Sequence, residues 1–410
     1  MNIRSGSMIK VAIILYHTGE TRALIPTMRA MARKSKDYEI LIVIAGEAAA
    51  ANVPEDLRAV TKVLSFIGQG RGSNKEYLKP FEAKDIQEVL NICEGYDHFV
   101  IGYPSEIQRQ IAQALSSLPH HQQVIIYFDA GSNPDKIRSF APLADVLIFT
   151  SHLNQKRAQA IVNEMDLIHQ PEVIAARHGD FDVWLRSYVD MQQDADKADA
   201  IRKELNVGLE DKVILWVGGY GKDYSSADRE AVSFRRFIDV LKGYPEYKLR
   251  ITAHPGVKSS EKKQEVLNTY YLKPLSEAGF SAMAIEQAIT AVDTREVVCA
   301  LGENFFLISA GSTAAAEALY AAGVRTKNFI VGGQEEPAFA IKNVEKEEDL
   351  SRVLERWKDR KRFITFYRGA NSEGLFKEYK EKVTKLDKIK KLGIPEASTK
   401  QVLLKQLLKS

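Results

Sequence analysis

The sequence predicts an α/β protein made of two doubly wound, Rossmann-like domains. Short, unbroken runs of apolar and β-branched residues alternate with segments of helical periodicity along most of the chain. Continuous apolar runs of this length indicate strands buried on both faces, as in a parallel sheet covered by helices. The alternation stops after residue 167 and restarts at residue 210, which indicates two domains.

The composition supports this class and excludes several others. The chain has 410 residues, of which 45% are hydrophobic and 27% charged, as in ordinary globular proteins. With 57 basic and 54 acidic residues it has a net charge of +3, so we expect no nucleic-acid partner. Cys93 and Cys299 lie far apart in the sequence and have neither metal-ligand nor disulfide-framework spacing, which favours a reducing, cytoplasmic location.

Residues 8–167 are predicted to form the N-terminal domain. The expected strands are Lys10–Leu15, Ile40–Ala45, Val63–Phe66, Phe99–Gly102, Val124–Phe128 and Val146–Phe149. The expected helices are Thr21–Arg33, Lys84–Ile92 and Ile107–Leu118. Pro171 and Gly179 interrupt the pattern and a polar helical stretch follows, so residues 168–209 are expected to be a linker and connecting helix.

Residues 210–375 are predicted to form the C-terminal domain, and residues 376–410 a basic helical tail. The expected strands are Lys212–Val217, Leu249–Ala253, Phe305–Ser309 and Asn328–Val331. The expected helices are Ala227–Leu241, Lys262–Ala278, Arg295–Gly302, Thr313–Ala322 and Lys346–Trp357, with Lys377–Lys391 and Lys400–Leu408 in the tail.

Functional residues are expected directly after the strands, because doubly wound folds bind ligands at the carboxyl ends of their strands. His17 and Gly19 follow the first strand, and Asp129 follows Val124–Phe128. Either His17 or Asp129 is suited to act as a general base, and Gly19 permits a tight turn before a helix capped by Thr21. The alternatives are an exposed histidine at a capped helix and an Asx-turn at Asp129.

Two loops of the second domain have residues suited to phosphate binding. Gly218, Gly219 and Gly221 allow a phosphate or sugar to approach the backbone closely, although such glycines also serve ordinary strand–helix turns. Pro255 keeps the preceding residue extended and so presents His254 rigidly to a phosphate oxygen, unless His254 is purely structural.

A third loop is the most informative. Gly311, Ser312 and Thr313 supply space, hydroxyls and backbone N–H groups at the start of a predicted helix, which is an anion-binding arrangement. Glu317 lies one turn further on and is placed to bind ribose hydroxyls, or is a surface glutamate after a helix cap. Gln334 and Glu335 follow another strand and either contact the sugar or form a solvated loop.

These residues resemble the nucleotide-sugar enzymes of the GT-B glycosyltransferase superfamily. The similarity is carried by His254-Pro255, by Gly311-Ser312-Thr313 with Glu317, and by the first loop from His17 to Arg22 followed by Pro26. The resemblance implies two Rossmann-like domains that face each other across a cleft. The N-terminal domain would bind the acceptor, the C-terminal domain the nucleotide-sugar donor, and the final helices would cross back to the first domain.

Three branches of this superfamily compete. The first is a general glycosyltransferase with His17 or Asp129 as base. The second is the bacterial sialyltransferase group, which is similar in the order Asp129-Ala130-Gly131-Ser132, His254-Pro255 and Ser312-Thr313, but here Phe128 stands where a second acid is expected. The third is the UDP-N-acetylglucosamine 2-epimerase type, which is similar at Gly19-Glu20-Thr21-Arg22, with Glu20 interposed and a glycine pair missing before the ribose-binding glutamate.

We therefore predict an inverting glycosyltransferase, with an epimerase and a non-catalytic nucleotide-sugar-binding protein as alternatives. The nucleotide sugar is the donor substrate, and we expect no cofactor and no obligatory metal. The acceptor, whether glycan, lipid or small molecule, is not encoded in a readable motif. Residues 377–410 contain ten lysines and four acidic residues, a pattern typical either of attachment to an anionic membrane at its inner face or of a solvated helix.

Overall fold

The computed structural model describes residues 8–65, 83–102, 105–118, 122–129, 133–208, 210–218, 227–253, 263–290, 292–301, 305–309, 325–329, 343–344, 346–358 and 394–409. The chain divides into an N-terminal unit of residues 1–180 and 393–410 and a C-terminal unit of residues 181–392. Each unit contains one parallel sheet covered by helices, so the predicted α/β class is confirmed.

The sheet of the N-terminal unit has seven parallel strands in the order β3-β2-β1-β4-β5-β6-β7. The strands are β1 Ile9–Leu15, β2 Tyr38–Ile44, β3 Lys62–Ser65, β4 His98–Ile101, β5 Gln123–Phe128, β6 Val146–Phe149 and β7 Glu172–Ala175. The helices are α1 Thr18–Ala32, α2 Glu47–Ala50, α3 Glu55–Arg58, α4 Ala83–Cys93, α5 Glu106–Ser116, α6 Pro134–Phe140, the 3-10 turn η1 Ala141–Leu143, α7 His152–Asn163 and α20 Thr399–Leu407.

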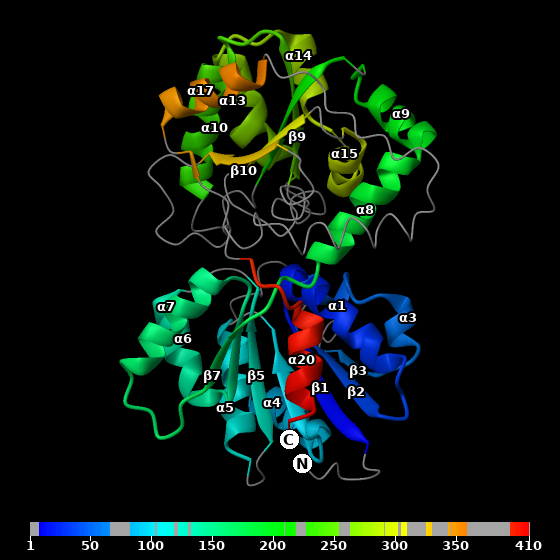
Figure 1. Cartoon of the computed structure of the whole chain (residues 1–410), viewed down its shortest axis with the longest axis vertical. Helices are drawn as coiled ribbons and strands as arrows, with labels where there is room; N and C mark the ends of the chain where they lie inside the picture. The colour runs from blue at the N-terminus through cyan, green and yellow to red at the C-terminus, as the bar shows by residue number, and fades with distance from the viewer. Residues whose placement is uncertain are drawn as a thin grey trace. The chain divides into compact units, whose positions relative to one another are not determined.

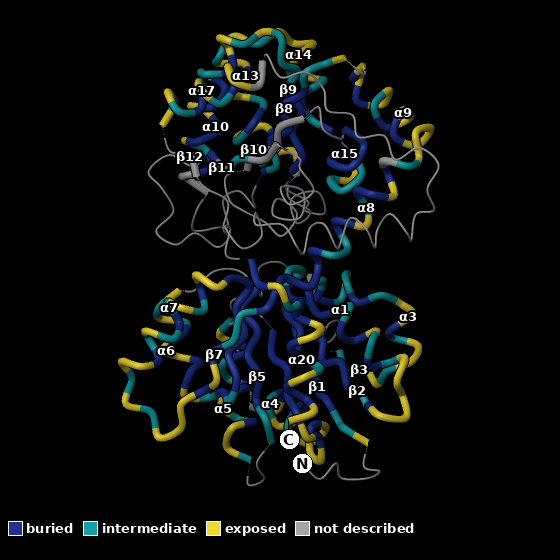
Figure 2. Tube along the Cα trace, viewed as in Figure 1, coloured by how far each residue is buried: buried dark blue, intermediate teal, exposed yellow. Residues whose placement is uncertain are grey.

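The helices cover both faces of this sheet (Figure 1). On one face α1, α2, α3 and α20 pack on residues such as Ile13 and Ile42, and on the other α4, α5, α6 and α7 pack on residues such as Phe99 and Phe128. The five inner strands are accordingly buried almost throughout, the edge strands β3 and β7 are mostly half-buried, and the outer helical surfaces are exposed (Figure 2). Burial on both sides explains why the strands read as continuous apolar runs.

Helix α20 contacts α1 and buries Val402, Leu403 and Leu407 in the N-terminal unit. It thus joins a core formed by residues more than 200 positions earlier in the sequence, as Figure 1 shows. The expectation that the end of the chain returns to the first domain is confirmed for residues 394–409.

The sheet of the C-terminal unit has five parallel strands in the order β12-β11-β10-β8-β9. They are β8 Lys212–Val217, β9 Tyr247–Thr252, β10 Phe305–Ser309, β11 Arg325–Phe329 and β12 Asn343–Val344. The helices are α8 Phe181–Gln193, α9 Ala195–Glu204, α10 Ala227–Leu241, α12 Lys263–Leu267, the π-helical turn η3 Asn268–Leu272, α13 Lys273–Glu277, α14 Ala282–Ala288, α15 Thr294–Leu301 and α17 Glu347–Lys358.

The core of this unit is built on aromatic side chains. The ring of Trp216 on β8 stacks on Phe237 at 5.0 Å and meets Phe234 edge-on at 5.1 Å. Both phenylalanines lie on α10, so these contacts hold that helix against the sheet. Helix α15 contacts β8 and packs against α8 and α9.

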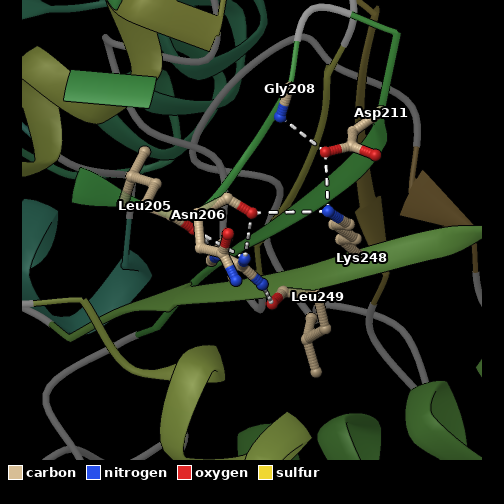
Figure 3. A network of polar contacts seen from close by, with 7 residues as sticks. Leu205, Asn206, Gly208, Asp211, Lys248 and Leu249 are labelled. Carbon is tan, nitrogen blue, oxygen red and sulfur yellow. Dashed lines mark hydrogen bonds and ion pairs between the residues drawn. The ribbon is translucent and has the colours of Figure 1, made fainter. Parts of the chain in front are cut away.

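A buried arginine joins α9 to β9. The guanidinium of Arg250 donates hydrogen bonds to the carbonyl oxygens of Leu205, at 2.6 and 2.8 Å, and of Asn206 and Leu249. Burial lowers the pKa of Arg250. The neighbouring Lys248 pairs with Asp211 at 2.7 Å (Figure 3). Cationic donors thus satisfy carbonyls just beyond the C-terminal end of α9, where no further helical turn is present to do so.

One boundary differs from the expectation. The stretch expected to be a linker, residues 168–209, contains strand β7 of the first sheet, followed by helices α8 and α9 of the second unit. Glu172–Ala175 pairs with β6 in parallel register, and a four-residue strand next to a proline carries too weak a periodic signal to be recognised in sequence.

Candidate active site

The predicted N-terminal site residues meet at one edge of the seven-stranded sheet. Strand β1 leads into His17, β4 into Gly102 and β5 into Asp129. From β1 the chain proceeds to β2 and β3 on one side, and then returns to β4 on the other. The carboxyl ends of β1 and β4 therefore flank a topological switch point, where doubly wound folds bind ligands.

Glu20, in the first turn of α1, is fully buried at this edge. Its Oε1 accepts hydrogen bonds from the backbone N–H groups of Tyr16, at 2.5 Å, and His17, at 2.6 Å. The side-chain amide of Gln108 on α5 approaches the same oxygen at 3.4 Å. Burial raises the pKa of Glu20 well above its ordinary value, and the charge of Asp129 raises it further. A Cβ at Gly102 would stand 2.3 Å from Glu20 Cγ, so glycine is required there.

Asp129 lies against the first turn of α1. A Cβ at Gly19 would stand 2.1 Å from Asp129 Oδ2, so the missing side chain of Gly19 is what admits the carboxylate. The positive end of the helix dipole favours an anion at this position.

The predicted role of Gly19 in a tight turn is wrong: Gly19 is helical and its φ is not positive. Thr21 is likewise not the cap, because the helix begins at Thr18 with His17 as N-cap.

His17 is neutral at pH 7, since burial and the nearby charge of Lys136 lower its pKa to about 4. Lys136 comes from α6 and also feels the charge of Asp129, which opposes the lowering of the lysine pKa by burial. The edge thus brings together an uncharged imidazole, a lysine and two carboxyl groups. Such a set can take a proton from a substrate hydroxyl or carbon and can orient an anionic substrate.

A second polar group follows β7 and lies near Tyr127 of β5. Nδ1 of His178 accepts the backbone N–H of Asp180 at 3.1 Å, so the neutral imidazole carries its proton on Nε2. Burial lowers the pKa of His178 to about 4. Tyr127, whose ring centre lies 6.5 Å from that of His178, is also buried, and its pKa is raised by burial and by Asp129 and Asp180.

The C-terminal segment secures this second group. Arg177 pairs with Ser398 as an isolated parallel bridge and donates from Nη1 to the carbonyl oxygen of Glu396 at 2.8 Å. The Thr399 hydroxyl donates to the carbonyl oxygen of Arg177 at 2.8 Å and lies 3.5 Å from the Tyr127 hydroxyl. The return of the chain therefore helps to shape the edge that carries Asp129.

In the C-terminal unit, Gly218 directly follows β8 and lies beside a buried hydroxyl. A Cβ at Gly218 would stand 2.0 Å from Tyr271 Oη. That hydroxyl donates to Glu230 Oε1 at 2.9 Å, and both side chains are buried. Tyr271 lies in the π-helical turn η3, a feature frequent at functional sites. Gly218 is thus required for packing against Tyr271.

The strand order of the second sheet brings the carboxyl ends of β8 and β10 side by side. Strands β8 and β10 are adjacent, with β9 on one side and β11 on the other, so the switch point of this sheet lies between them. In the sequence, Gly218 directly follows β8. The other predicted donor-site residues lie outside the described residues; they are Gly219, Gly221, His254, Pro255, Gly311, Ser312, Thr313, Glu317, Gln334 and Glu335.

Sequence reasoning did not single out Glu20, Lys136 or Gly102 as site residues. The spacing from His17 to Glu20 is that of a capping box, which signals a helix start and gives no indication of a buried acid. A buried position for Glu20 could be inferred only from Gly102, the glycine that follows β4 and leaves room for the Glu20 side chain. That inference requires knowing that β4 lies next to β1.

The expectation of a metal-free protein also overlooked two Asp-x-Asp sequences, Asp180-Phe181-Asp182 and Asp194-Ala195-Asp196. Asp180 is buried in the structure. Within the described part of the chain, no three His, Cys, Asp or Glu side chains gather as a metal site would require. Metal independence stays a prediction.

Neither a protein-family model nor a curated protein sequence matches this chain. Solved structures do match in fold. UDP-GlcNAc 2-epimerase from Neisseria meningitidis, bound to UDP-GlcNAc, is 12% identical with a TM-score of 0.57, covering 98% of this chain and 100% of that one. The Methanocaldococcus jannaschii UDP-GlcNAc 2-epimerase, in complex with UDP-GlcNAc and UDP, is 15% identical with a TM-score of 0.55, covering 90% and 99%.

HepE from Anabaena, in complex with UDP and glucose, is 10% identical with a TM-score of 0.58, covering 98% of this chain and 100% of that one. These matches span nearly the whole chain, and the fold is of the GT-B type, as the sequence resemblance implied. Within the described residues, no helix is long and apolar enough to cross a lipid bilayer.

Proposed function

We propose that this protein is an enzyme that acts on a nucleotide sugar, with UDP-linked sugars as the first candidates. The observation that carries the proposal is the convergence of His17, Asp129 and Lys136 at the switch point of the first sheet. Structures of the same fold hold UDP-GlcNAc, UDP or UDP-glucose, which supports a nucleotide sugar as substrate.

The two units have different tasks in this proposal. The loops after β8, β9 and β10, with Gly218, His254 and Gly311-Ser312-Thr313, bind the donor's phosphates, and Glu317 binds ribose. Holding the departing nucleotide is the larger catalytic contribution, because negative charge develops there. Asp129, with His17 beside it, provides proton transfer, which contributes roughly 10²–10⁴-fold.

Two reactions fit this division. Epimerisation removes a carbon-bound proton of the sugar and returns one to the other face, and it is favoured by the epimerases among the structural neighbours. Transfer moves the sugar to an acceptor whose hydroxyl loses a proton to the base, and it is favoured by the similarity to HepE in complex with UDP-glucose. The sequence alone favoured transfer, and the neighbours favour epimerisation at least as strongly.

A single experiment separates these reactions. The protein is incubated with UDP-GlcNAc or UDP-glucose in D₂O, with and without a mixture of sugar acceptors, and followed by proton NMR. An epimerase forms a new UDP-sugar that carries deuterium at the inverted carbon and needs no acceptor. A transferase releases UDP in proportion to acceptor consumed, without deuterium in the donor. If calorimetry shows that the UDP-sugar binds but neither epimerisation nor transfer occurs, the protein is a non-catalytic nucleotide-sugar-binding protein.

Two further arms extend this assay. A thermal-shift screen with UDP, GDP, CMP and their sugars identifies which nucleotide the protein binds, because a ligand that binds the folded state raises the unfolding temperature. Turnover in EDTA tests the metal: we expect no change. Loss of turnover that manganese restores would contradict metal independence.

A further inference from the structure

Glu20 is an enclosed acid with its two oxygens in different surroundings. Oε1 accepts two short backbone hydrogen bonds, whereas Oε2 is buried and receives no hydrogen bond from any described residue. An ionised carboxylate in such a place leaves half of its charge without compensation, which is costly in a buried site. A protonated acid fits better, with its carbonyl oxygen toward the backbone N–H groups and its O–H on the other oxygen.

The charged groups around Glu20 point to the same arrangement. Asp129, at the end of β5, lies against Gly19, the residue before Glu20, and its charge acts on Glu20. Lys136 on α6 acts on Asp129 and on His17. Gln108 on α5 adds an amide to Glu20 Oε1. Two carboxyl groups held together do not both ionise readily, and the lysine favours Asp129 as the ionised member.

We propose that Glu20 is a positioning residue that keeps its proton and, through it, holds the Asp129 carboxylate in place as the base of the first sheet's edge. A hydrogen bond donated by a neutral acid stabilises the ionised form of the carboxylate that accepts it, and this is how the proton of Glu20 would act on Asp129. The catalytic part rests on the proposed function, but the protonation of Glu20 does not.

Protonation is tested by stability against pH, using Glu20→Gln and Glu20→Leu in the full-length protein. Glutamine keeps an acceptor for the backbone and a donor for Asp129, and does not titrate. The pKa of Glu20 is raised in the folded state, so the unfolded chain loses its proton first and stability falls as pH rises above about 4.5. The unfolding equilibrium constant of the wild type should therefore rise relative to Glu20→Gln by up to about tenfold per pH unit between about pH 5 and the raised pKa.

Two results overturn this part. If the stability difference between wild type and Glu20→Gln is independent of pH, or if Glu20→Gln is as unstable as Glu20→Leu at all pH values, Glu20 is not a protonated donor. Glu106→Gln is the matched control, because Glu106 is an exposed carboxyl on α5 paired with Arg109.

Positioning is tested by the pH profile of turnover on a nucleotide sugar. The wild type should lose activity on the alkaline side as Glu20 ionises and repels Asp129, and Glu20→Gln should lack this alkaline limb. Glu20→Leu should lower turnover by about 10–100-fold, as expected for a misplaced base, and Glu20→Gln should restore part of that loss. An unchanged alkaline limb in Glu20→Gln refutes positioning. Absence of turnover in the wild type instead refutes the proposed function. The stability measurement still shows whether Glu20 is protonated in the folded protein.

Discussion

Asp129 Oδ2 occupies the space that a side chain on Gly19 would need, 2.1 Å from the position of the missing Cβ. The glycine lies in the first turn of α1 and the carboxylate at the end of β5, more than a hundred residues later. The contact joins the segment after β1, in which the sequence singles out His17 and Gly19, to Asp129, which the sequence singles out independently.

Gly19→Ala should therefore impair catalysis more than folding. Alanine favours the helix by up to about 1 kcal/mol, but its methyl group displaces Asp129, and a displacement near 1 Å costs about 10²-fold in turnover. Steady-state kinetics together with thermal unfolding measure both effects. Gly243→Ala, at a glycine of the second unit whose Cβ would meet its nearest neighbour at 3.4 Å, should alter neither quantity by much.

Asp129→Asn should lower kcat by roughly 10²–10⁴-fold with little change in nucleotide affinity, because the base is lost and the donor loops remain. His17→Ala should have a smaller effect, since an imidazole with a pKa of about 4 holds a proton weakly at pH 7. Turnover on the substrate found in the D₂O experiment provides the test. Near-normal turnover in both variants would show that neither residue is the base.

His178 should make the N-terminal unit sensitive to acid. Its pKa of about 4 in the folded protein lies below the ordinary 6.5, so the unfolded chain binds the proton first as the pH falls. The associated stability is present above about pH 6.5 and is lost toward pH 4, by about 3 kcal/mol in total. Urea unfolding at several pH values should show a shallower acid slope in His178→Gln. The control is His152→Gln, at an exposed histidine of α7. If this variant reduces the acid slope as much as His178→Gln does, the acid sensitivity does not come from His178.

Arg250→Ala should destabilise the C-terminal unit by about 2–4 kcal/mol, because it removes the donor that satisfies carbonyls beyond the end of α9. Arg352→Ala removes an exposed partner of Asp349 and should cost less than about 1 kcal/mol. Chemical denaturation compares the two. Equal effects would mean that the guanidinium network of Arg250 adds nothing beyond a surface pair.

Membrane attachment through the basic tail also has a direct test. Deleting residues 377–410 would remove α20 from the core of the N-terminal unit, so the test uses Lys→Gln substitutions at Lys377, Lys380, Lys382, Lys385 and Lys388 instead. Co-sedimentation with vesicles containing phosphatidylserine should fall in this variant if the tail binds anionic lipid. Equal sedimentation of both proteins removes the membrane hypothesis.

Strands made of unbroken apolar runs were predicted well even when short, since β6 has the expected limits Val146–Phe149, whereas segments with a weak apolar pattern were missed. The run from Lys212 to Val217 forms β8 within the same limits, and Val124–Phe128 forms β5 with one further residue. Strand β7 and the short helices α2 and α3 were missed because they contain few apolar residues in a recognisable pattern. The twelve-residue helix α7, His152–Asn163, was also missed, because its buried face consists of Asn154, Ala158 and Val162 and so forms only a weak apolar stripe. The expected helix at Thr313–Ala322 lies outside the described residues.

The sequence by itself determined the α/β class, the two sheets and the polar residues that follow β1 and β5, because periodicity and chain order are local properties. It did not determine that Glu20, Asp129 and Lys136 share one edge, since that depends on β1 lying next to β4 and β4 next to β5. Only the tertiary structure decided which carboxyl group is enclosed. Burial and the charge of a neighbour raise the pKa of Glu20, and both depend on what folding brings beside it.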